Sequence, residues 1–254
     1  MITVCLATYN GAHYISEQLR SVLSQLGPLD EVVVSDDCST DNTRELIANL
    51  VDSRIRILEG GDRLGVVKNF ERAFLEARGD MVFLCDQDDV WLPGKCAVIS
   101  DVFRRNPSVL VIVSDAQLID ASGQVTSESF MATRGGFCGN ALCTLMRNRY
   151  LGCAMAVRRE LLVAALPMPN GVPMHDMWLG ALGSLLGGVY YIPTPLLQYR
   201  RHNFNVSPAR HQGWLRMLLW RFALLVALAG RIFKLVLGRH VSVIMPSLPG
   251  GSKS

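Results

Sequence analysis

Three carboxylates crowd the end of one apolar segment. Asp86, Asp88 and Asp89 directly follow residues 81–85, an apolar stretch of strand length. Like charges this close together raise one another's pKa and destabilise a fold unless something positive lies near them. Mg²⁺ and Mn²⁺ prefer oxygen ligands of this kind, and a bound cation offsets the repulsion. The pattern therefore predicts a divalent metal site whose open positions would suit a diphosphate.

Two other segments of strand pattern also end in polar residues. Thr8 and Tyr9 follow residues 2–7, and Asp36 follows residues 31–35. Because ligands of parallel sheets bind beyond the carboxyl ends of the strands, we expect all three strand ends to line one crevice. Residues 39–41 (Ser-Thr-Asp) are explained equally well as a helix N-cap.

In the first 115 residues, short apolar runs of strand length alternate with segments whose apolar residues recur at helical spacing. This alternation predicts an α/β fold with a mostly parallel sheet flanked by helices. We expect strands at residues 2–7, 31–35, 54–58, 81–85 and 109–114, and helices at 12–26, 41–51, 66–78 and 95–105. Later segments predict a strand at 153–157, helices at 159–166 and 175–186, and strand-like pieces at 189–192 and 196–199. The 254 residues are half hydrophobic, which is enough for one large core.

The cysteines and the N-terminus point to a reducing compartment. The seven cysteines are odd in number and show no CxxC spacing, so we expect packing residues in a cytosolic protein rather than disulfides or zinc ligands. No basic leader precedes the first strand pattern, so no secretion signal is expected. No dinucleotide or P-loop glycine pattern appears either, and nothing beyond positive charge indicates a nucleic-acid partner.

Three motifs, in this order and at this spacing, resemble the signature blocks of family 2 inverting glycosyltransferases of GT-A fold, particularly the rhamnosyltransferase-like branch. They are residues 8–10 (Thr-Tyr-Asn), 35–41 (Ser-Asp-Asp-Cys-Ser-Thr-Asp) and 86–91 (Asp-Gln-Asp-Asp-Val-Trp), and the resemblance covers about residues 1–210. It implies metal-dependent transfer of a sugar, with L-rhamnose from dTDP-rhamnose the first choice and a UDP-sugar the other donor. A saccharide or lipid-linked acceptor in cell-surface polysaccharide synthesis is also implied.

The resemblance assigns roles to individual residues of the first half. Thr8 and Tyr9 would line the base pocket, and Asp36 would accept a hydrogen bond from the N3–H of uracil or thymine. Asp86 would face the ribose, and Asp88 would bind Mg²⁺ or Mn²⁺.

Three more residues belong to the same nucleotide-binding blocks. Cys38 stands where many relatives have glycine, so we expect a slightly different turn there. Arg63 and Asn69 fall in a block that borders the nucleotide, although a helix start and surface charge explain them almost equally well.

The resemblance also assigns roles in the second half. Asp176 matches the catalytic carboxylate, and it is the last acidic residue of the chain; His175 is expected to line the pocket. His202 would complete the metal site. Arg200 and Arg201 would neutralise diphosphate oxygens, or belong to a solvated loop.

The C-terminal part is acid-free. Residues 177–254 hold nine basic and no acidic residues, whereas residues 1–176 hold 16 basic and 22 acidic ones. At helical spacing, Arg216, Arg231 and Lys234 share one face with Arg221 at its edge. The opposite face carries Leu218, Phe222, Leu225, Val226, Ala229, Phe233 and Val236. This pattern predicts a helix on an anionic membrane surface, with packing on the catalytic domain as the alternative.

The predicted organisation places the catalytic domain at residues 1–210, with a nucleotide-binding half at 1–115 and an acceptor-binding half at 116–210. The amphipathic helix follows at 211–240 and a disordered tail at 241–254. We expect a cytoplasmic protein, peripheral at the inner face of the cell membrane. Two other functions remain open: a haloacid-dehalogenase-like phosphatase, because residues 86–90 also match its Asp-x-Asp motif, and a non-enzymatic membrane-associated binding module.

Overall fold

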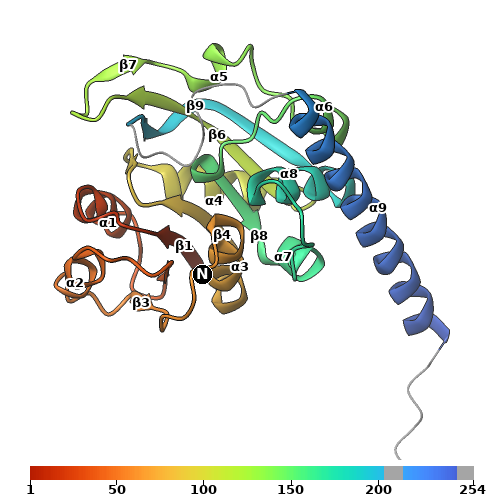
Figure 1. The fold of residues 1–254 in the computed structure, drawn as a ribbon, viewed down its shortest axis with the longest axis horizontal. Coiled ribbons are helices and arrows are strands. Elements are labelled where there is room, and N and C mark those ends of the chain that lie inside the picture. The colour runs from red at the N-terminus through yellow and green to blue at the C-terminus, as the bar shows by residue number, and fades with distance from the viewer. Residues whose placement is uncertain (203–213, 245–254) are drawn as a thin grey trace, which may run out of the picture.

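A nine-stranded mixed sheet with helices packed against it forms the body of the protein (Figure 1). The computed structural model describes residues 1–202 and 214–244. The strand order is β3-β2-β1-β4-β8-β6-β9-β5, with β7 paired to β6. One continuous sheet thus joins the two halves that the sequence analysis distinguishes.

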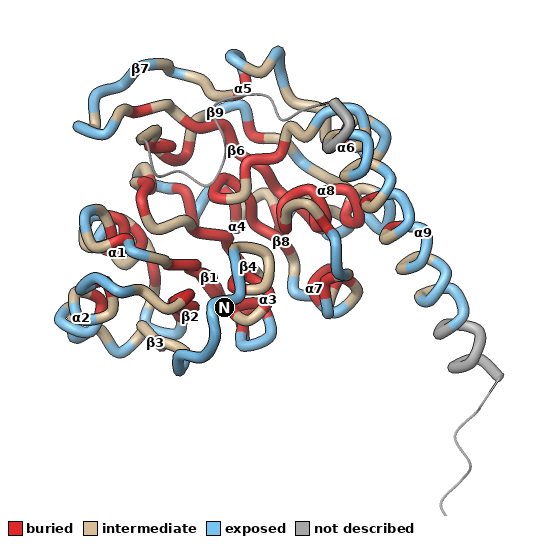
Figure 2. Tube along the Cα trace, in the orientation of Figure 1, coloured by how far each residue is buried: buried red, intermediate tan, exposed pale blue. Residues whose placement is uncertain are grey.

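The first half of the sheet is parallel, as the alternating pattern predicts. It contains β1 (Ile2–Thr8), β2 (Glu31–Asp36), β3 (Ile55–Ile57) and β4 (Met81–Asp86). The strands β1 and β2 are buried along their whole length, because helices cover both faces of the sheet. Those helices are α1 (Ile15–Leu23), α2 (Thr43–Ala48), α3 (Val66–Glu76) and α4 (Lys95–Arg105). Figure 2 shows this buried interior as a continuous set of red segments.

The second half is mixed. The strand β8 (Met155–Arg158) enters antiparallel between β4 and β6 (Val111–Ile119). The strand β9 (Val189–Arg200) runs parallel to β6 and antiparallel to β5 (Val90–Trp91). The two predicted strand pieces at 189–192 and 196–199 form this single strand, because shifts in register against β6 accommodate Pro193 and Pro195.

Short elements connect and cover these strands. They are β7 (Val125–Ser127), α5 (Phe130–Thr133), α6 (Ala141–Met146), the 3₁₀ turn η1 (Gly152–Ala154), α7 (Arg159–Ala165) and α8 (His175–Leu186). The prediction that every cysteine is reduced is wrong for one pair, because Cys138 and Cys143 form a disulfide at the start of α6. Their Cα atoms lie 6.1 Å apart, within the range that a disulfide spans. Only the fold of this loop brings the two residues together.

The last helix, α9 (Trp214–Ile244), lies along α6 and α8 and extends past them (Figure 1). Among the described residues, no helix combines the length and hydropathy needed to cross a membrane. Of the tail predicted to be disordered, residues 241–244 belong to α9, and residues 245–254 lie outside the described part of the chain.

Two helical glycines make a matched test of packing in this half. A Cβ added at Gly180 in α8 would overlap the buried Tyr150 ring, whereas a Cβ at Gly230 in α9 would meet nothing within 4 Å. We expect Gly180→Ala to lower the free energy of unfolding by about 1–3 kcal/mol. Gly230→Ala should raise it by up to about 1 kcal/mol, because alanine is the better helix former. Urea unfolding of both variants measures the difference, and equal effects would contradict this packing.

Candidate active site

The register of the sheet brings the predicted strand ends together. Thr8 lies opposite Asp36 on β2, and the neighbouring Ala7 lies opposite Asp86 on β4. The two carboxylates therefore flank the end of the central strand β1. The prediction that these strand ends share one edge of the sheet is confirmed.

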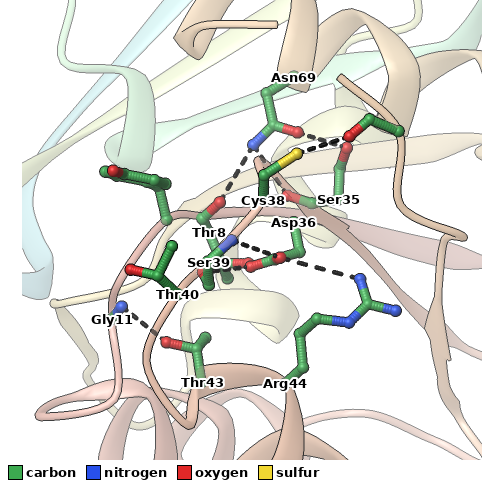
Figure 3. A network of polar contacts seen from close by, with 12 residues as sticks. Thr8, Gly11, Ser35, Asp36, Cys38, Ser39, Thr40, Thr43, Arg44 and Asn69 are labelled. Carbon is green, nitrogen blue, oxygen red and sulfur yellow. Dashed lines mark hydrogen bonds and ion pairs between the residues drawn. The ribbon is translucent and has the colours of Figure 1, made fainter. Parts of the chain in front are cut away.

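Asp36 is buried and fully engaged with its surroundings. It accepts hydrogen bonds from the Thr8 hydroxyl at 2.7 Å and from the backbone N–H and hydroxyl of Ser39 at 3.0 and 2.6 Å. Arg44 lies 3.8 Å away, and Figure 3 shows these groups arranged around the carboxylate. Cys38 adopts a φ of 63°, in the left-handed region that favours glycine. Contact between Asp36 and a nucleobase remains a prediction.

Asn69 and Arg72, both on α3, hold the ends of β1 and β2. The Asn69 amide donates to the backbone carbonyls of Ser35 at 2.8 Å and Thr8 at 3.4 Å, and its oxygen accepts from the Ser35 hydroxyl at 2.6 Å (Figure 3). Arg72 donates to the Ser35 hydroxyl and to the Asp36 carbonyl. The position of Arg72, one helical turn after Asn69, is the only sequence signal for this role.

Tyr9 is held from both sides. The Gln87 side chain accepts from the Tyr9 backbone N–H at 2.8 Å and donates to the Tyr9 carbonyl at 2.9 Å. The Arg63 guanidinium lies 3.7 Å from the centre of the Tyr9 ring and 3.8 Å from the Asp37 carboxylate. Gln87 thus ties the loop after β1 to the acidic segment, a role that sequence reasoning missed.

The acidic segment after β4 is balanced by buried positive charge. Burial, followed by the charges of Asp89, Asp88 and Asp176, raises the pKa of Asp86 well above its usual range. Burial and the charge of Asp88 raise the pKa of Asp89 to about 7. Lys95 is fully buried beside them, and its charge lowers both pKa values; its ammonium donates to the Cys153 carbonyl at 2.8 Å. Lys95 was also missed, because it reads as an ordinary first residue of a helix.

The two predicted metal ligands touch each other. Nε2 of His202 lies 2.7 Å from Oδ2 of Asp88. Mg²⁺ holds octahedral ligands at about 2.1 Å, which places neighbouring ligand atoms roughly 3.0 Å apart. At 2.7 Å the two side chains are hydrogen-bonded to each other. An imidazole nitrogen and a carboxylate oxygen are ligand types that Mn²⁺ or Mg²⁺ takes, so the chemistry of the pair fits the predicted cation. Asp86, Asp89 and Cys153 also bring one ligand atom each within 4.8 Å of one another, but a buried thiol suits a softer metal.

Arg200 anchors this acidic segment from the far end of β9. Its backbone N–H donates to Asp89 at 3.0 Å, and Nε donates to the Asp88 carbonyl at 2.9 Å. The guanidinium also pairs with Glu17 of α1 at 2.7 Å and lies over the Tyr14 ring. The sequence analysis left Arg200 open between a diphosphate contact and a solvated loop, and the buried side chain is not in a solvated loop. In the structure these donors are directed at protein groups, so Arg200 positions Asp88 and Asp89.

Asp176 lies in the first turn of α8 and faces the same carboxylates. It accepts from the backbone N–H of Met177 at 2.6 Å and from the Asn148 amide at 3.4 Å. Burial raises its pKa to about 6, and its charge in turn raises the pKa of Asp86. The preceding His175 stacks on Phe70 with ring centres 4.0 Å apart, and burial lowers its pKa to about 3. His175 is therefore a neutral packing residue next to Asp176.

The chain belongs to glycosyl transferase family 2, whose family model matches residues 3–162. It is 30% identical over 216 residues to an uncharacterised glycosyltransferase of Nostoc sp. (strain PCC 7120), covering 80% of this chain and 66% of that one. It is 26% identical to the dTDP-rhamnosyl transferase RfbG of Shigella flexneri, covering 79% of this chain and 72% of that one. Family membership removes the phosphatase and the non-enzymatic module as alternatives.

A shorter match joins this chain to WfgD of Escherichia coli. That protein is named a UDP-Glc:alpha-D-GlcNAc-diphosphoundecaprenol beta-1,3-glucosyltransferase, and it is 32% identical over 43% of this chain and 44% of its own length. Two solved structures share the fold. One is Staphylococcus aureus TarS with UDP-GlcNAc, with a TM-score of 0.61, 20% identity and 80% of this chain covered. The present chain spans 59% of that TarS chain.

The other structure is the mannosyltransferase PcManGT of Pyrobaculum calidifontis with GDP-Man and Mn²⁺. Its TM-score is also 0.61, at 17% identity, and the match covers 98% of this chain and 76% of that one. Both structures confirm the GT-A fold class.

The anchoring role of Arg200 can be tested by a change that keeps its charge. Lysine cannot reproduce the planar fork that reaches Asp88 and Glu17 together, so the acidic segment should shift. We expect Arg200→Lys to lower kcat/KM about tenfold to a hundredfold, since small misplacements of catalytic groups carry costs of this size. Arg20→Lys, on the exposed side of α1, is the matched control and should leave kcat/KM unchanged. A fully active Arg200→Lys enzyme would refute the anchoring role.

Proposed function

We propose that this protein transfers a sugar from a nucleoside diphosphate to an acceptor hydroxyl, with inversion at the anomeric carbon. The observation that carries the proposal is the convergence of Asp86, Asp88, His202 and Asp176 at one edge of the sheet. The carboxylate and imidazole groups of this set suit a divalent cation, which would in turn bind a diphosphate, and Asp176 stands apart on α8 with a raised pKa. These are the parts that an inverting transfer needs.

The donor side of the site is formed by the strand ends. We place the nucleotide against Thr8, Tyr9, Asp36, Asn69 and Asp86, and we favour dTDP-rhamnose as donor. The relationship to RfbG, which is named a dTDP-rhamnosyl transferase, supports this choice. A UDP-sugar is the alternative, because TarS has been solved with UDP-GlcNAc.

We assign Asp88 and His202 as ligands of Mg²⁺ or Mn²⁺. When bound, such a cation supplies positive charge to the departing diphosphate, usually the largest electrostatic contribution at sites of this kind. Among the chain's own residues, Arg200 and Lys95 hold the acidic segment in place for this task. Support for Mn²⁺ comes from the ion found with PcManGT.

Asp176 acts as the general base in this proposal. Its carboxylate removes the proton from the acceptor hydroxyl, whose oxygen then forms the bond to the anomeric carbon while the bond to the diphosphate oxygen breaks. Asn148 donates to one oxygen of Asp176, and the stacked His175 fixes the start of α8. The carboxylate is therefore held in one orientation before the acceptor arrives.

The acceptor is proposed to be a saccharide or a lipid-linked saccharide in cell-surface polysaccharide synthesis. The names of RfbG and WfgD support a role of this kind, and the WfgD name includes a diphosphoundecaprenol acceptor. A cytoplasmic enzyme at the inner face of the membrane would meet such an acceptor.

If Asp176 is the general base, a substitution that alters only the chemistry of its side chain should greatly reduce turnover. Asp176→Asn keeps the shape of the side chain but removes its basicity, so kcat should fall about 10²- to 10⁴-fold while donor binding persists. For the unchanged enzyme, the carboxylate form grows as pH rises through the raised pKa of about 6, so kcat/KM should rise across that range and then level off. Unchanged turnover in Asp176→Asn would exclude this residue as the base.

The metal and donor assignments predict a coupled effect on thermal stability. A ligand that binds only the folded state raises the melting temperature. Among dTDP-, UDP- and GDP-sugars, we expect the largest rise with dTDP-rhamnose and only when Mn²⁺ is present. Asp88→Ala should abolish the part of this rise in melting temperature that requires Mn²⁺. Asp101→Ala, on the outer surface of α4, should keep it. A normal metal-dependent shift in Asp88→Ala would count against the metal site.

A further inference from the structure

The outer face of α9 is a continuous stripe of exposed apolar side chains. With 3.6 residues per turn, they fall in one sector roughly 120° wide. The members of this apolar stripe are Leu218, Leu219, Phe222, Leu225, Val226, Phe233, Val236 and Leu237. Figure 2 shows the outward side of α9 in pale blue over most of its described length. Exposed apolar surface of this continuity marks an interaction site rather than ordinary surface.

The opposite face fastens the helix to the body of the protein. Leu224 and Leu228 are buried against it. Arg231 donates to the carbonyls of Ala164 and Leu166 at 3.1 and 2.8 Å, at the end of α7. This docking fixes the rotation of α9 about its own axis.

Arg221 attaches α9 to a second helix, α6. It donates to the carbonyl of Met146, the last residue of α6. A cation at the C-terminus of a helix is favoured by the helix dipole and by the free carbonyls there. Two of the arginines predicted to face an anionic surface therefore serve to hold the helix in place, and the apolar side is turned outward.

The shape of the stripe argues against a second copy of the chain as its partner. A two-helix seam uses a narrow strip of positions, here Leu218, Phe222, Leu225, Phe233 and Val236. The flanking Leu219, Val226 and Leu237 widen the strip on one side, and no charged residue lies within it among the side chains described. A broad apolar face with no polar group is suited to the acyl region of a bilayer.

The charge of this part of the chain favours an anionic surface. Residues 177–254 carry nine basic and no acidic residues. Arg200, Arg221 and Arg231 are bound to protein groups, whereas the exposed Lys234 borders the stripe. We propose that α9 lies flat in the interface of an anionic membrane, with the apolar stripe inserted. Basic residues near such a surface strengthen binding because the lipid headgroups are negative.

This placement has a consequence for the site, which rests on the proposed function. The helix α9 packs on α8, and the first turn of α8 carries Asp176. The membrane-bound helix would thus hold the acceptor side of the enzyme next to the bilayer. A lipid-linked acceptor would then reach Asp176 without leaving the membrane surface.

Vesicle binding by the full-length protein tests the proposal. The protein is sedimented with vesicles of equimolar phosphatidylglycerol and phosphatidylcholine, and with vesicles of phosphatidylcholine alone. We expect strong binding to the anionic vesicles and weaker binding to the neutral ones. Phe222→Glu and Phe233→Glu, at positions 67% and 65% exposed, should each lower the partition coefficient about ten- to a hundredfold.

Leu75→Glu is the matched control, because Leu75 is 63% exposed but lies on α3 and is not part of the apolar stripe. It should bind vesicles as the unchanged protein does. Failure of the unchanged protein to sediment, or equal binding by the Phe222 and Phe233 variants, would overturn the proposal. Equal binding to neutral vesicles would overturn the choice of an anionic surface. No donor or acceptor is present, so this outcome is independent of the sugar-transfer proposal.

Light scattering of the same proteins tests whether a second copy of the chain, rather than a membrane, covers the apolar stripe. We expect no self-association through α9. A dimer in solution that Phe222→Glu converts to monomers would show that a second copy covers the stripe, and it would overturn the membrane proposal.

Discussion

The repulsion among Asp86, Asp88 and Asp89 is the constraint around which this site is built. Three carboxylates within four residues are placed at the end of a buried strand, where burial makes their charges costlier still. Positively charged and hydrogen-bond donor groups from separate segments lie against these carboxylates and offset the repulsion. Lys95 comes from α4, the Arg200 backbone N–H and side chain come from β9, and His202 lies two residues after the end of β9. The acidic segment is thereby held in one shape.

This arrangement explains why the second half of the sheet departs from a simple parallel pattern. The strand β9 pairs with both β6 and β5, so its end lies beside the acidic segment that β5 follows. Antiparallel β8 lies between β4 and β6. Cys153, just before β8, is thereby placed next to Lys95, whose ammonium donates to its carbonyl. The mixed topology therefore joins the second half of the chain to the acidic segment through the sheet itself.

The amphipathic pattern of the C-terminal helix is compatible with two arrangements, packing on the domain and contact with a membrane. Its alternation of basic and apolar faces predicts either a membrane helix or a helix packed on the domain. In the structure Arg221 and Arg231 are turned toward the domain, where they reach carbonyls at the ends of α6 and α7, whereas Lys234 is exposed. The apolar face is exposed as a result. Packing on the domain and an exposed apolar stripe are thus compatible in one helix.

The sequence by itself determined the local elements and the polar ends of the strands. Side-chain alternation along a strand and periodicity along a helix are local properties, so the parallel half, α8 and the positions of Asp36, Asp86, Asp88 and Asp176 followed from it. The resemblance to a known family then supplied their expected roles, and it named His202, which the structure places against Asp88.

Only the tertiary structure decided which distant groups meet. Arg200 lies 111 residues from Asp89, and Gln87 lies 78 residues from Tyr9, so no local pattern shows that they pair. The rotation of α9 is set in the same way, because Arg231 meets a carbonyl 67 residues earlier in the chain. The physical reason is that a hydrogen bond or an ion pair depends on the approach of two groups within about 3–4 Å. That approach is set by how the sheet and helices pack, and sequence spacing does not encode it.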